Sequence, residues 1–586
     1  MEEWLVAYKK ADFKAIGEMF SIDQVTARII RNRGVIEPED IRRFLNGGIE
    51  DLHDPSLLKD ADLLTDILLE KIKEQQPIRI IGDYDIDGVM SVYILQKALS
   101  GCGARVSYQV PDRIRDGYGL SRGLVEEAKR DGIDTILTCD NGIAALEEIS
   151  YAKSMGMTVL VTDHHAPPYE EQDGVRRYLP SEADAVVNPH QADCPYPYKE
   201  LCGAGVAWKI VCLLFGKSGR DMAEAEQFLE NVAFATVGDI VDLTGENRIL
   251  VKEGIKRIHR TANIGMGALI AECGLEPEQI DAFHFGFVLG PCINASGRLE
   301  TARKALELFF AQTKKEAKII ANELVALNEQ RKEMTKRAVA EAISICEGAE
   351  YKKQRVLVVF LPKVHESIAG IVAGRLRDYF YKPVFVLTRG EDGIKGSGRS
   401  IEAYSMYDEM CRCGELFIRF GGHPMAAGLS MREDKIPLLR ERLNALAALS
   451  DEDLTPKVHI DVPMPADYVT EELVSEFALL APFGKGNPKP VFADRDLSIS
   501  RMWLVGKNQN VLRMSLRTAA GTPVSAVYFG DADALFSYLE ARFGKIEAEA
   551  AKQGKENQIR ISIVYFPRIH TYNGRNTLQF EIAHYR

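Results

Sequence analysis

The same pattern occurs three times in this chain: in PIRIIGDYDIDG (77–88), DTILTCDNG (134–142) and MTVLVTDHH (157–165), an apolar run ends in aspartate. The apolar runs are rich in Ile, Val, Leu and Thr, as buried strands are. A fourth run of this kind, ARVSYQVP (104–111), lies between the first two. Stretches with helical periodicity separate all four. The alternation of strands and helices predicts repeated βαβ units and a parallel sheet.

Acids at the ends of these strands predict a metal site. Ligands of an open parallel sheet bind outside the carboxyl ends of its strands, so acids distant in sequence should meet at one rim. GDIVD (238–242) adds two acids after a helical stretch, and either could contribute. Crowded carboxylates repel one another, and their pKa values rise unless a cation lies among them. Mixed Asp and His ligands favour Mn²⁺, Mg²⁺, Fe or Zn, and so many acids favour two metals with a bridging carboxylate.

A calcium-binding EF-hand is the competing interpretation of Asp83-Tyr84-Asp85-Ile86-Asp87-Gly88. That loop requires a bidentate Glu at its twelfth position, and the twelfth residue here is Ile94. The segment is also preceded by a strand rather than by a helix. Both features argue against the EF-hand.

The rest of the chain changes character three times. From Arg298 to Glu347 there is no Gly or Pro, which predicts a helical spacer of one long helix, up to ~75 Å, or of two helices. A second α/β pattern follows, with two glycine-dense segments, and then many short β-type runs, which suggest a barrel or sandwich. The predicted fold class is α/β, with five regions: a helical lead-in (1–75), a parallel-sheet domain (76–297), the connecting helix (298–348), a smaller α/β domain (349–454) and a C-terminal β-barrel (455–586).

Composition excludes several classes of protein. With 586 residues, 46% hydrophobic and 27% charged, the chain is neither disordered nor fibrous nor a disulfide scaffold. Its net charge of −12 excludes a histone-like coat protein. Residues 455–586 have a slightly positive balance, with 16 Lys and Arg against 14 Asp and Glu, whereas residues 1–454 together have a net charge of −14. The ten scattered cysteines form no Cys-x-x-Cys pair. The acidic N-terminus and the absence of a ~20-residue apolar run predict a soluble, cytoplasmic protein.

Taken together, the motifs resemble the DHH phosphoesterase superfamily. Its catalytic domain is matched by GDYDIDG (82–88), TCDNG (138–142), DHH (163–165) and VGDIVD (237–242). GRS (398–400) and GGHPMAAG (421–428) resemble the companion DHHA1 domain. LAPFGKGNPKPVF (480–492) resembles the start of the OB-fold domain in the single-strand-specific DNA exonucleases of this superfamily. The combination covers nearly the whole chain.

The resemblance implies roles for particular residues. The implied metal ligands are Asp83, Asp85, Asp87, Asp140, His164 and Asp239, with Asp140 as the bridge. Asp163 would orient a ligand, and His165 would face the scissile phosphate, so the implied catalytic set is Asp140, Asp163, His164 and His165. The implied nucleic-acid contacts are Arg298, within Asn294-Ala295-Ser296-Gly297-Arg298, and His365, Ser397, Arg399, Gly422 and His423. One departure is Lys363-Val364-His365, where the family usually has Gly-Trp-His.

The implied function is a metal-dependent exonuclease that degrades single-stranded DNA from 5′ to 3′ into mononucleotides, in DNA repair and recombination. Two divalent ions, Mn²⁺ or Mg²⁺, would be its cofactors. Single-stranded DNA, a single-strand-binding protein and a RecQ-type helicase would be partners of a monomer that does not bind membranes. The alternatives are a phosphoesterase of short oligoribonucleotides or cyclic dinucleotides, and a scaffold without activity. The sequence leaves open the metal used in the cell, processivity, the delivering partner, DNA versus RNA preference, and direct ligation by Asp83.

Overall fold

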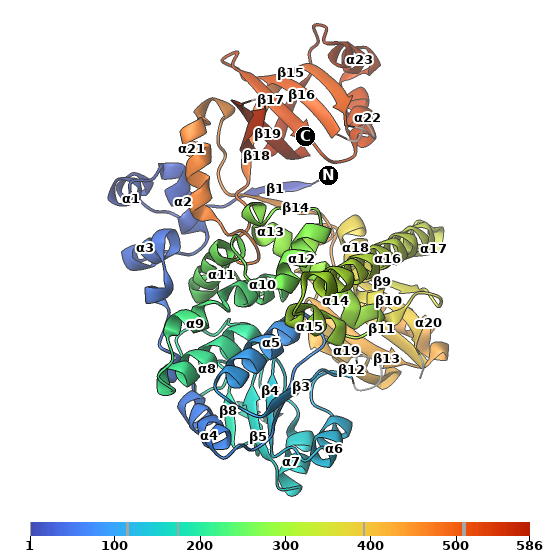
Figure 1. Ribbon diagram of the computed structural model, residues 1–586. Helices are drawn as coiled ribbons and strands as arrows, with labels where there is room; N and C mark the ends of the chain where they lie inside the picture. Colours follow the sequence, from blue (N-terminus) through green and yellow to red (C-terminus); the bar gives the residue numbers. More distant parts are fainter. Residues whose placement is uncertain (1, 113–116, 173–174, 391–392, 507–510, 573) are drawn as a thin grey trace. The chain divides into compact units, whose positions relative to one another are not determined.

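The structure is a computed structural model that describes residues 2–112, 117–172, 175–390, 393–506, 511–572 and 574–586 (Figure 1). Its residues form two compact units. The large unit comprises residues 52–456, and the split unit joins residues 2–51 to residues 457–586. The sequence predicted one lead-in over 1–75, whereas the structure distributes these residues between both units.

The first sheet of the large unit is parallel, as predicted, and places the acid-bearing strands side by side. In spatial order its strands are β3 (Val106–Gln109), β2 (Ile78–Ile81), β4 (Thr135–Cys139), β5 (Thr158–Thr162) and β8 (Ala185–Val187). The four predicted strands are all present. The fifth, β8, was not predicted, because three residues carry too little pattern. Since β4 pairs with both β2 and β5, the three acid-bearing ends lie at one edge.

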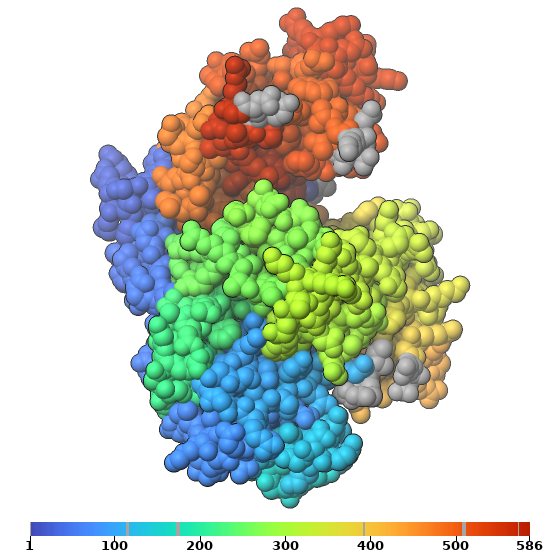
Figure 2. All heavy atoms as spheres, in the orientation of Figure 1, coloured from blue at the N-terminus to red at the C-terminus, as the bar shows by residue number. Residues whose placement is uncertain are grey.

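Helices buried on nearly all sides support this edge. The strands are connected by α5 (Ile86–Gly101), α6 (Arg122–Arg130) and α7 (Leu146–Ser154). Two later helices, α8 (Gly203–Lys217) and α10 (Leu229–Gly238), pack against α5 (Figure 1). Most residues of α5, α8 and α10 are buried, as is typical of core helices. In the space-filling view the blue surface of α5 adjoins the green helical surface without a break (Figure 2).

The predicted connecting helix is divided in two after the end of α14 (Gly290–Leu299). The two helices are α15 (Arg303–Phe310) and α16 (Lys314–Cys346), whose 33 residues span ~50 Å. Thr313 begins α16 by accepting a hydrogen bond from the Glu316 backbone N–H at 3.2 Å. Near its C-terminal end α16 buries Ala338 and Ala342 in the core of the second sheet. Neither α16 nor any other helix in the described ranges combines the length and apolar character needed to cross a bilayer.

The second sheet of the large unit contains both glycine-dense segments as strands. Its spatial order is β12 (Phe417–His423), β13 (Ala426–Met431), β11 (Gly393–Arg399), β10 (Val384–Gly390) and β9 (Leu357–Phe360). Only the β9–β10 pair is parallel. A Cβ atom on Gly396 would lie 2.5 Å from the Leu387 side chain, so glycine is needed there for close packing. The helix α18 (Glu366–Phe380) packs on β10 and β11.

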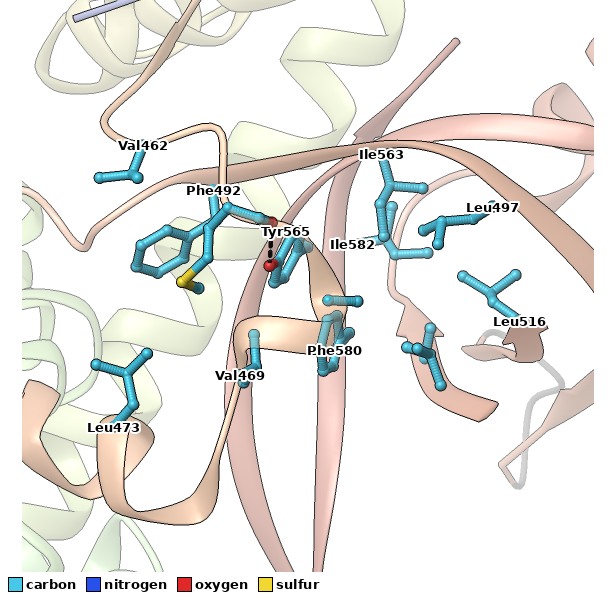
Figure 3. Packing of buried hydrophobic residues seen from close by; sticks show 14 of the residues in the cluster. Val462, Val469, Leu473, Phe492, Leu497, Leu516, Ile563, Tyr565, Phe580 and Ile582 are labelled. Carbon is cyan, nitrogen blue, oxygen red and sulfur yellow. Dashed lines mark hydrogen bonds between the residues drawn. The ribbon is translucent and has the colours of Figure 1, made fainter. Parts of the chain in front are cut away.

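The split unit contains the predicted barrel. Its closed order is β15 (Phe492–Val505), β16 (Val511–Arg517), β17 (Pro523–Tyr528), β19 (Arg575–Tyr585) and β18 (Arg560–Tyr572). Phe492, Tyr565 and Phe580 fill part of its core, and the Tyr565 hydroxyl donates to the Met464 carbonyl at 2.7 Å (Figure 3). Three helices of this region were not predicted: α21 (Glu471–Glu476), α22 (Ala532–Phe543) and α23 (Lys545–Gln553).

Residues 2–51 are an integral part of the split unit. The strand β1 (Glu3–Val6) pairs in parallel with β14 (Lys457–Ile460). Arg33 forms a bidentate, nearly buried ion pair with Asp461, with N–O distances of 2.6 and 3.0 Å. Ile29 and Ile30 are fully buried in the same core as the barrel residues. This core therefore needs both ends of the chain.

A pH-dependent stability is expected from Glu230 of α10. Burial raises the pKa of this carboxyl to about 7, although the Thr261 hydroxyl donates to it at 2.9 Å. The pKa of Glu230 in the folded protein exceeds the ordinary value of 4.5. The free energy of unfolding therefore decreases as the pH rises from 4.5 to about 7. Glu230→Gln should remove this loss and stabilise the protein above pH 7, on the order of 3 kcal/mol, but not below pH 4.5. The measurement is the thermal unfolding midpoint at pH 5 and pH 8.

The matched control is Glu278→Gln, because Glu278 is exposed. It should not change the pH dependence. A Glu230→Gln effect of equal size at both pH values would contradict the explanation.

Candidate metal centre

Two of the acids after β2 are held by helix N-termini. Asp85 caps α5, and its Oδ1 accepts hydrogen bonds from the backbone N–H groups of Asp87 and Gly88 at 3.0 and 3.2 Å. Asp87 is fully buried and accepts from Gly203 N–H at 2.6 Å and Ala204 N–H at 2.7 Å, where α8 begins. The positive end of α8 thus stabilises a charge that burial would otherwise disfavour.

Asp140 follows β4 in a left-handed conformation, with φ +60°. Its backbone N–H donates to the Thr162 carbonyl at 3.1 Å, which ties it to the end of β5. The start of α8 packs directly against it, since a Cβ atom on Gly203 would lie 2.6 Å from the Asp140 Cβ. The conformation of Asp140 therefore depends on contacts with two other segments.

The two histidines after β5 are oriented by Asp163. The Oδ1 of Asp163 accepts from the His164 backbone N–H at 2.7 Å and lies 2.8 Å from the His165 Nδ1. Burial alone would raise the pKa of Asp163, but the hydrogen bond and charge of His165 hold that pKa below its ordinary value. His164 then points its Nε2 toward three carboxylates, 3.1 Å from Asp140, 3.5 Å from Asp87 and 3.7 Å from Asp239.

Potential ligand atoms converge in three overlapping groups. Within each group the ligand atoms lie within 4.8 Å of one another. The groups are Asp83–Asp85–Asp140, Asp87–His164–Asp239 and Asp140–His164–His165. Asp140 and His164 each belong to two groups, which is the arrangement that two neighbouring ions with a bridging carboxylate would require. Of the two acids in GDIVD, Asp239 lies in a group and Asp242 does not.

The electrostatics of the site favour a bound cation. Burial, and next the charge of Asp85, raises the pKa of Asp83 to about 8. Burial, and next the charge of Asp87, also raises the pKa of Asp85 and of Asp140. Asp83 Oδ2, Asp140 Oδ1 and His164 Nε2 are buried and form no hydrogen bond of good geometry with a described residue, although the last two atoms lie 3.1 Å apart. Oxygen ligands with one or two imidazoles fit Mn²⁺ or Mg²⁺, and such an ion would satisfy these atoms.

The NASGR motif, Asn294 to Arg298, joins this site to the second body of the large unit, by which we mean the second sheet with α18. Asn294 Oδ1 accepts from the Ile86 N–H at 2.9 Å and so fixes the start of α5. Arg298, predicted to contact phosphate, donates from Nη1 to the Ser367 carbonyl of α18 at 2.7 Å. The motif therefore connects the metal-site helix to α18, a contact that the sequence did not predict.

The other predicted phosphate-contacting residues surround α18 and its neighbouring strands. His365 caps α18, with its Nδ1 2.7 Å from the Ser367 Oγ. Ser397 and Arg399 lie on the α18 side of β11, where a Cβ atom on Gly370 would be 2.9 Å from Arg399 Nη2. At the ends of β12 and β11, His423 and Arg399 both pair with Ala426 of β13. Gly422 precedes His423 with φ +148°, and both are exposed.

Tyr118 is a site residue that sequence reasoning missed. Its hydroxyl donates to the Asp140 carbonyl at 3.0 Å and lies 3.1 Å from the His165 Nε2. In the sequence, Tyr118 is conspicuous only because it lies between two glycines, Gly117 and Gly119. That pattern does not predict contacts with Asp140 and His165, which are 22 and 47 positions away.

Family models match three parts of the chain: the N-terminal domain of the DHH family over residues 77–236, the DHHA1 domain over residues 353–449 and the RecJ OB domain over residues 460–584. The single-stranded-DNA-specific exonuclease RecJ of Salmonella typhimurium is 34% identical over 519 residues, which cover 85% of this chain and 87% of that protein. The chain belongs to the RecJ family. Both the predicted family and the predicted class of single-stranded-DNA-specific exonuclease are thereby confirmed.

Other RecJ relatives agree in sequence and fold. The Bacillus subtilis RecJ is 35% identical over 508 residues, which cover 86% of this chain and 63% of that longer protein. The crystal structure of Thermus thermophilus RecJ in complex with Mn²⁺ matches with a TM-score of 0.82 at 25% identity, covering all of this chain and 79% of that chain. The predicted fold class, with DHH and DHHA1 domains, a helical spacer and an OB-like barrel, is confirmed.

The packing of α8 against Asp140 leads to a test with an internal control. Gly203→Ala should push α8 away from Asp140 and lower the affinity for Mn²⁺ about 10-fold or more, because the carboxylates of Asp87 and Asp140 would shift. Overpacking should also destabilise the fold by about 1–3 kcal/mol. Titration calorimetry with Mn²⁺ and thermal unfolding measure the two effects.

Gly216→Ala, near the other end of the same helix, meets no atom within 4 Å and should be neutral or stabilise by up to ~1 kcal/mol. Equal Mn²⁺ affinity in the two variants would show that this contact does not shape the metal site.

Proposed function

We propose that this protein is a metal-dependent exonuclease that degrades single-stranded DNA from the 5′ end to mononucleotides, in DNA repair and recombination. The observation that carries the proposal is the convergence of three ligand groups at one sheet edge, in a chain of the RecJ family. Burial disfavours the charged forms of these crowded carboxylates, so the cluster by itself would not stabilise the fold.

The proposed metal ligands are Asp83, Asp85, Asp87, Asp140, His164 and Asp239, with Asp140 bridging two ions. Bound Mn²⁺ or Mg²⁺ would lower the pKa of a water molecule and polarise the scissile phosphodiester. Asp163 orients His165 through their 2.8 Å contact, so that His165, which is partly exposed, can donate a hydrogen bond to the phosphate. These assignments rest on the distances above and on the donor types.

We further propose that the second body of the large unit binds the strand. Arg399, Ser397, His365, Gly422 and His423 would hold phosphates, and Arg298 would act at the junction with α18. A guanidinium offers two parallel donors to a phosphate, and glycine allows backbone N–H groups to approach it. Burial, and next the charge of Arg377, lowers the pKa of Arg399, which indicates that a bound anion would be favoured there.

The split unit would extend the contact with DNA, since OB folds bind single strands by groove charge and base stacking. A single-strand-binding protein and a RecQ-type helicase are proposed partners because the substrate must be unwound and delivered. We keep the monomeric state and the cytoplasmic location as predictions, the latter because chromosomal DNA is the proposed substrate.

Asp140→Asn tests the proposed chemistry. It should reduce Mn²⁺-dependent hydrolysis by more than about 100-fold, because metal ions supply several kcal/mol of transition-state stabilisation. Affinity for single-stranded DNA and the unfolding midpoint should change little. The assay uses single strands labelled at the 5′ or 3′ end, a blunt duplex and a dinucleotide.

Wild-type protein should release the 5′ label first, as a mononucleotide, and leave the duplex intact. The control Asp193→Asn changes an exposed aspartate that pairs with Lys59 and should behave as wild type. Cleavage of the dinucleotide alone would favour the small-substrate phosphoesterase, and no cleavage of any substrate would favour the scaffold.

Arg399→Lys tests the second body. The change keeps the charge but removes bidentate contact, so affinity for single-stranded DNA should fall about 10-fold. Mn²⁺ affinity should be unchanged. Arg389→Lys is the matched control, because Arg389 lies on the neighbouring strand, is 59% exposed and pairs with Glu433. A fall in Mn²⁺ affinity in Arg399→Lys would instead assign Arg399 to the metal site.

A further inference from the structure

Tyr118 makes contacts that the proposed chemistry does not yet use. It precedes α6 and lies between Gly117 (φ +81°) and Gly119 (φ +66°), a backbone path that other residues adopt only with strain. The residue is 52% exposed, so it contributes little to the core. Its hydroxyl end reaches Asp140 and His165 of the metal site. Such a placement points to a polar role rather than to packing.

The first contact holds the backbone of Asp140. The Tyr118 hydroxyl donates its single proton to the Asp140 carbonyl at 3.0 Å, while the Asp140 N–H donates to Thr162. The backbone N–H and the carbonyl of this left-handed residue are therefore both hydrogen-bonded. A non-glycine residue in that conformation persists only when its surroundings hold it there. Loss of the hydroxyl would release one of the two restraints.

The second contact holds the His165 ring. Asp163 bonds its Nδ1 at 2.8 Å, and the Tyr118 oxygen lies 3.1 Å from its Nε2. The two rings also meet edge to face, with centroids 5.6 Å apart and an interplanar angle of 79°. The same oxygen lies 3.2 Å from the His165 Nδ1, so the hydroxyl restrains the ring from a position nearly equidistant from its two nitrogens.

Gly119, the residue after Tyr118, contacts a third residue of the metal site, Asp83. Gly119 donates its backbone N–H toward Asp83 Oδ1 at 3.4 Å. A Cβ atom on Gly119 would lie 2.9 Å from the Asn141 Cβ, so the segment packs closely on the residues after β4. Two consecutive residues thus contact the acids after β2 and β4 and the histidine after β5.

We propose that Tyr118 is a positioning residue that acts through Asp140 and His165. The inference rests on the proposed function, since it concerns the same metal site. Its hydroxyl sets the bridging carboxylate and the phosphate-facing imidazole relative to each other. The aromatic ring alone cannot do this, because the polar contacts with Asp140 and His165 both end on the phenol oxygen.

The test is Tyr118→Phe, which removes one oxygen atom and retains the ring. We expect kcat for single-stranded DNA to fall about 10–100-fold and the Mn²⁺ concentration for half-maximal rate to rise, with KM for DNA nearly unchanged. Calorimetric titration with Mn²⁺ in the absence of DNA should show weaker binding by the same variant. The unfolding midpoint should match that of the wild type.

Tyr169→Phe is the control, since Tyr169 is 42% exposed on the β6 strand (Tyr169–Gln172) and contacts Tyr178 instead of the metal rim. It should have wild-type kinetics. A Tyr118→Phe variant with unchanged kcat and unchanged Mn²⁺ binding would overturn the inference. A raised KM alone would do so as well, because the tyrosine would then bind DNA directly. Inactivity of the wild type on DNA would reject the proposed function, while the Mn²⁺ titration would still decide the role of Tyr118.

Discussion

Repulsion among buried carboxylates is the interaction on which the rest of this structure depends. Asp83, Asp85, Asp87 and Asp140 meet at the carboxyl ends of two paired strands, and burial raises the pKa of Asp83, Asp85 and Asp140. The fold compensates in part, because the N-terminus of α8 donates two hydrogen bonds to Asp87. The remaining unpaired oxygens are left for a cation. The cluster is thus unfavourable as an empty protein site and favourable as a metal site.

The surrounding helices turn this local arrangement into a rigid one. The start of α5 is fixed by Asn294, and the start of α8 is fixed by contact with Asp87 and Asp140. The same α14 that carries Asn294 also carries Arg298, which is bonded to α18. Since α16 takes part in the core of the second sheet, the two bodies of the large unit share helices rather than a loose linker. Such coupling suits a site whose metal ligands and phosphate contacts come from different sheets.

Sequence patterns predicted the elements with strong local signals and missed those without. The strands β2, β3, β4 and β5 were predicted from apolar runs, whereas β8, with three residues, gives no period to measure. The helices α21, α22 and α23 were missed within a region dominated by β-type runs. Residues 2–51 were predicted as helical, but an amphipathic helix does not reveal which core covers its apolar face. The barrel residues that share a core with residues 2–51 begin more than 400 positions later in the chain.

The sequence by itself determined the order of strands and helices, the presence of acids at the strand ends and the family motifs. Each of these depends on residues close together in the chain. Only the tertiary structure decided which atoms converge. Gly203 donates a hydrogen bond to Asp87, 116 positions away, and Tyr118 contacts Asp140 and His165. It also distinguished Asp239 from Asp242 and tied Arg298 to α18. Such distances follow from strand register and helix packing, which arise from long-range contacts that no local pattern encodes.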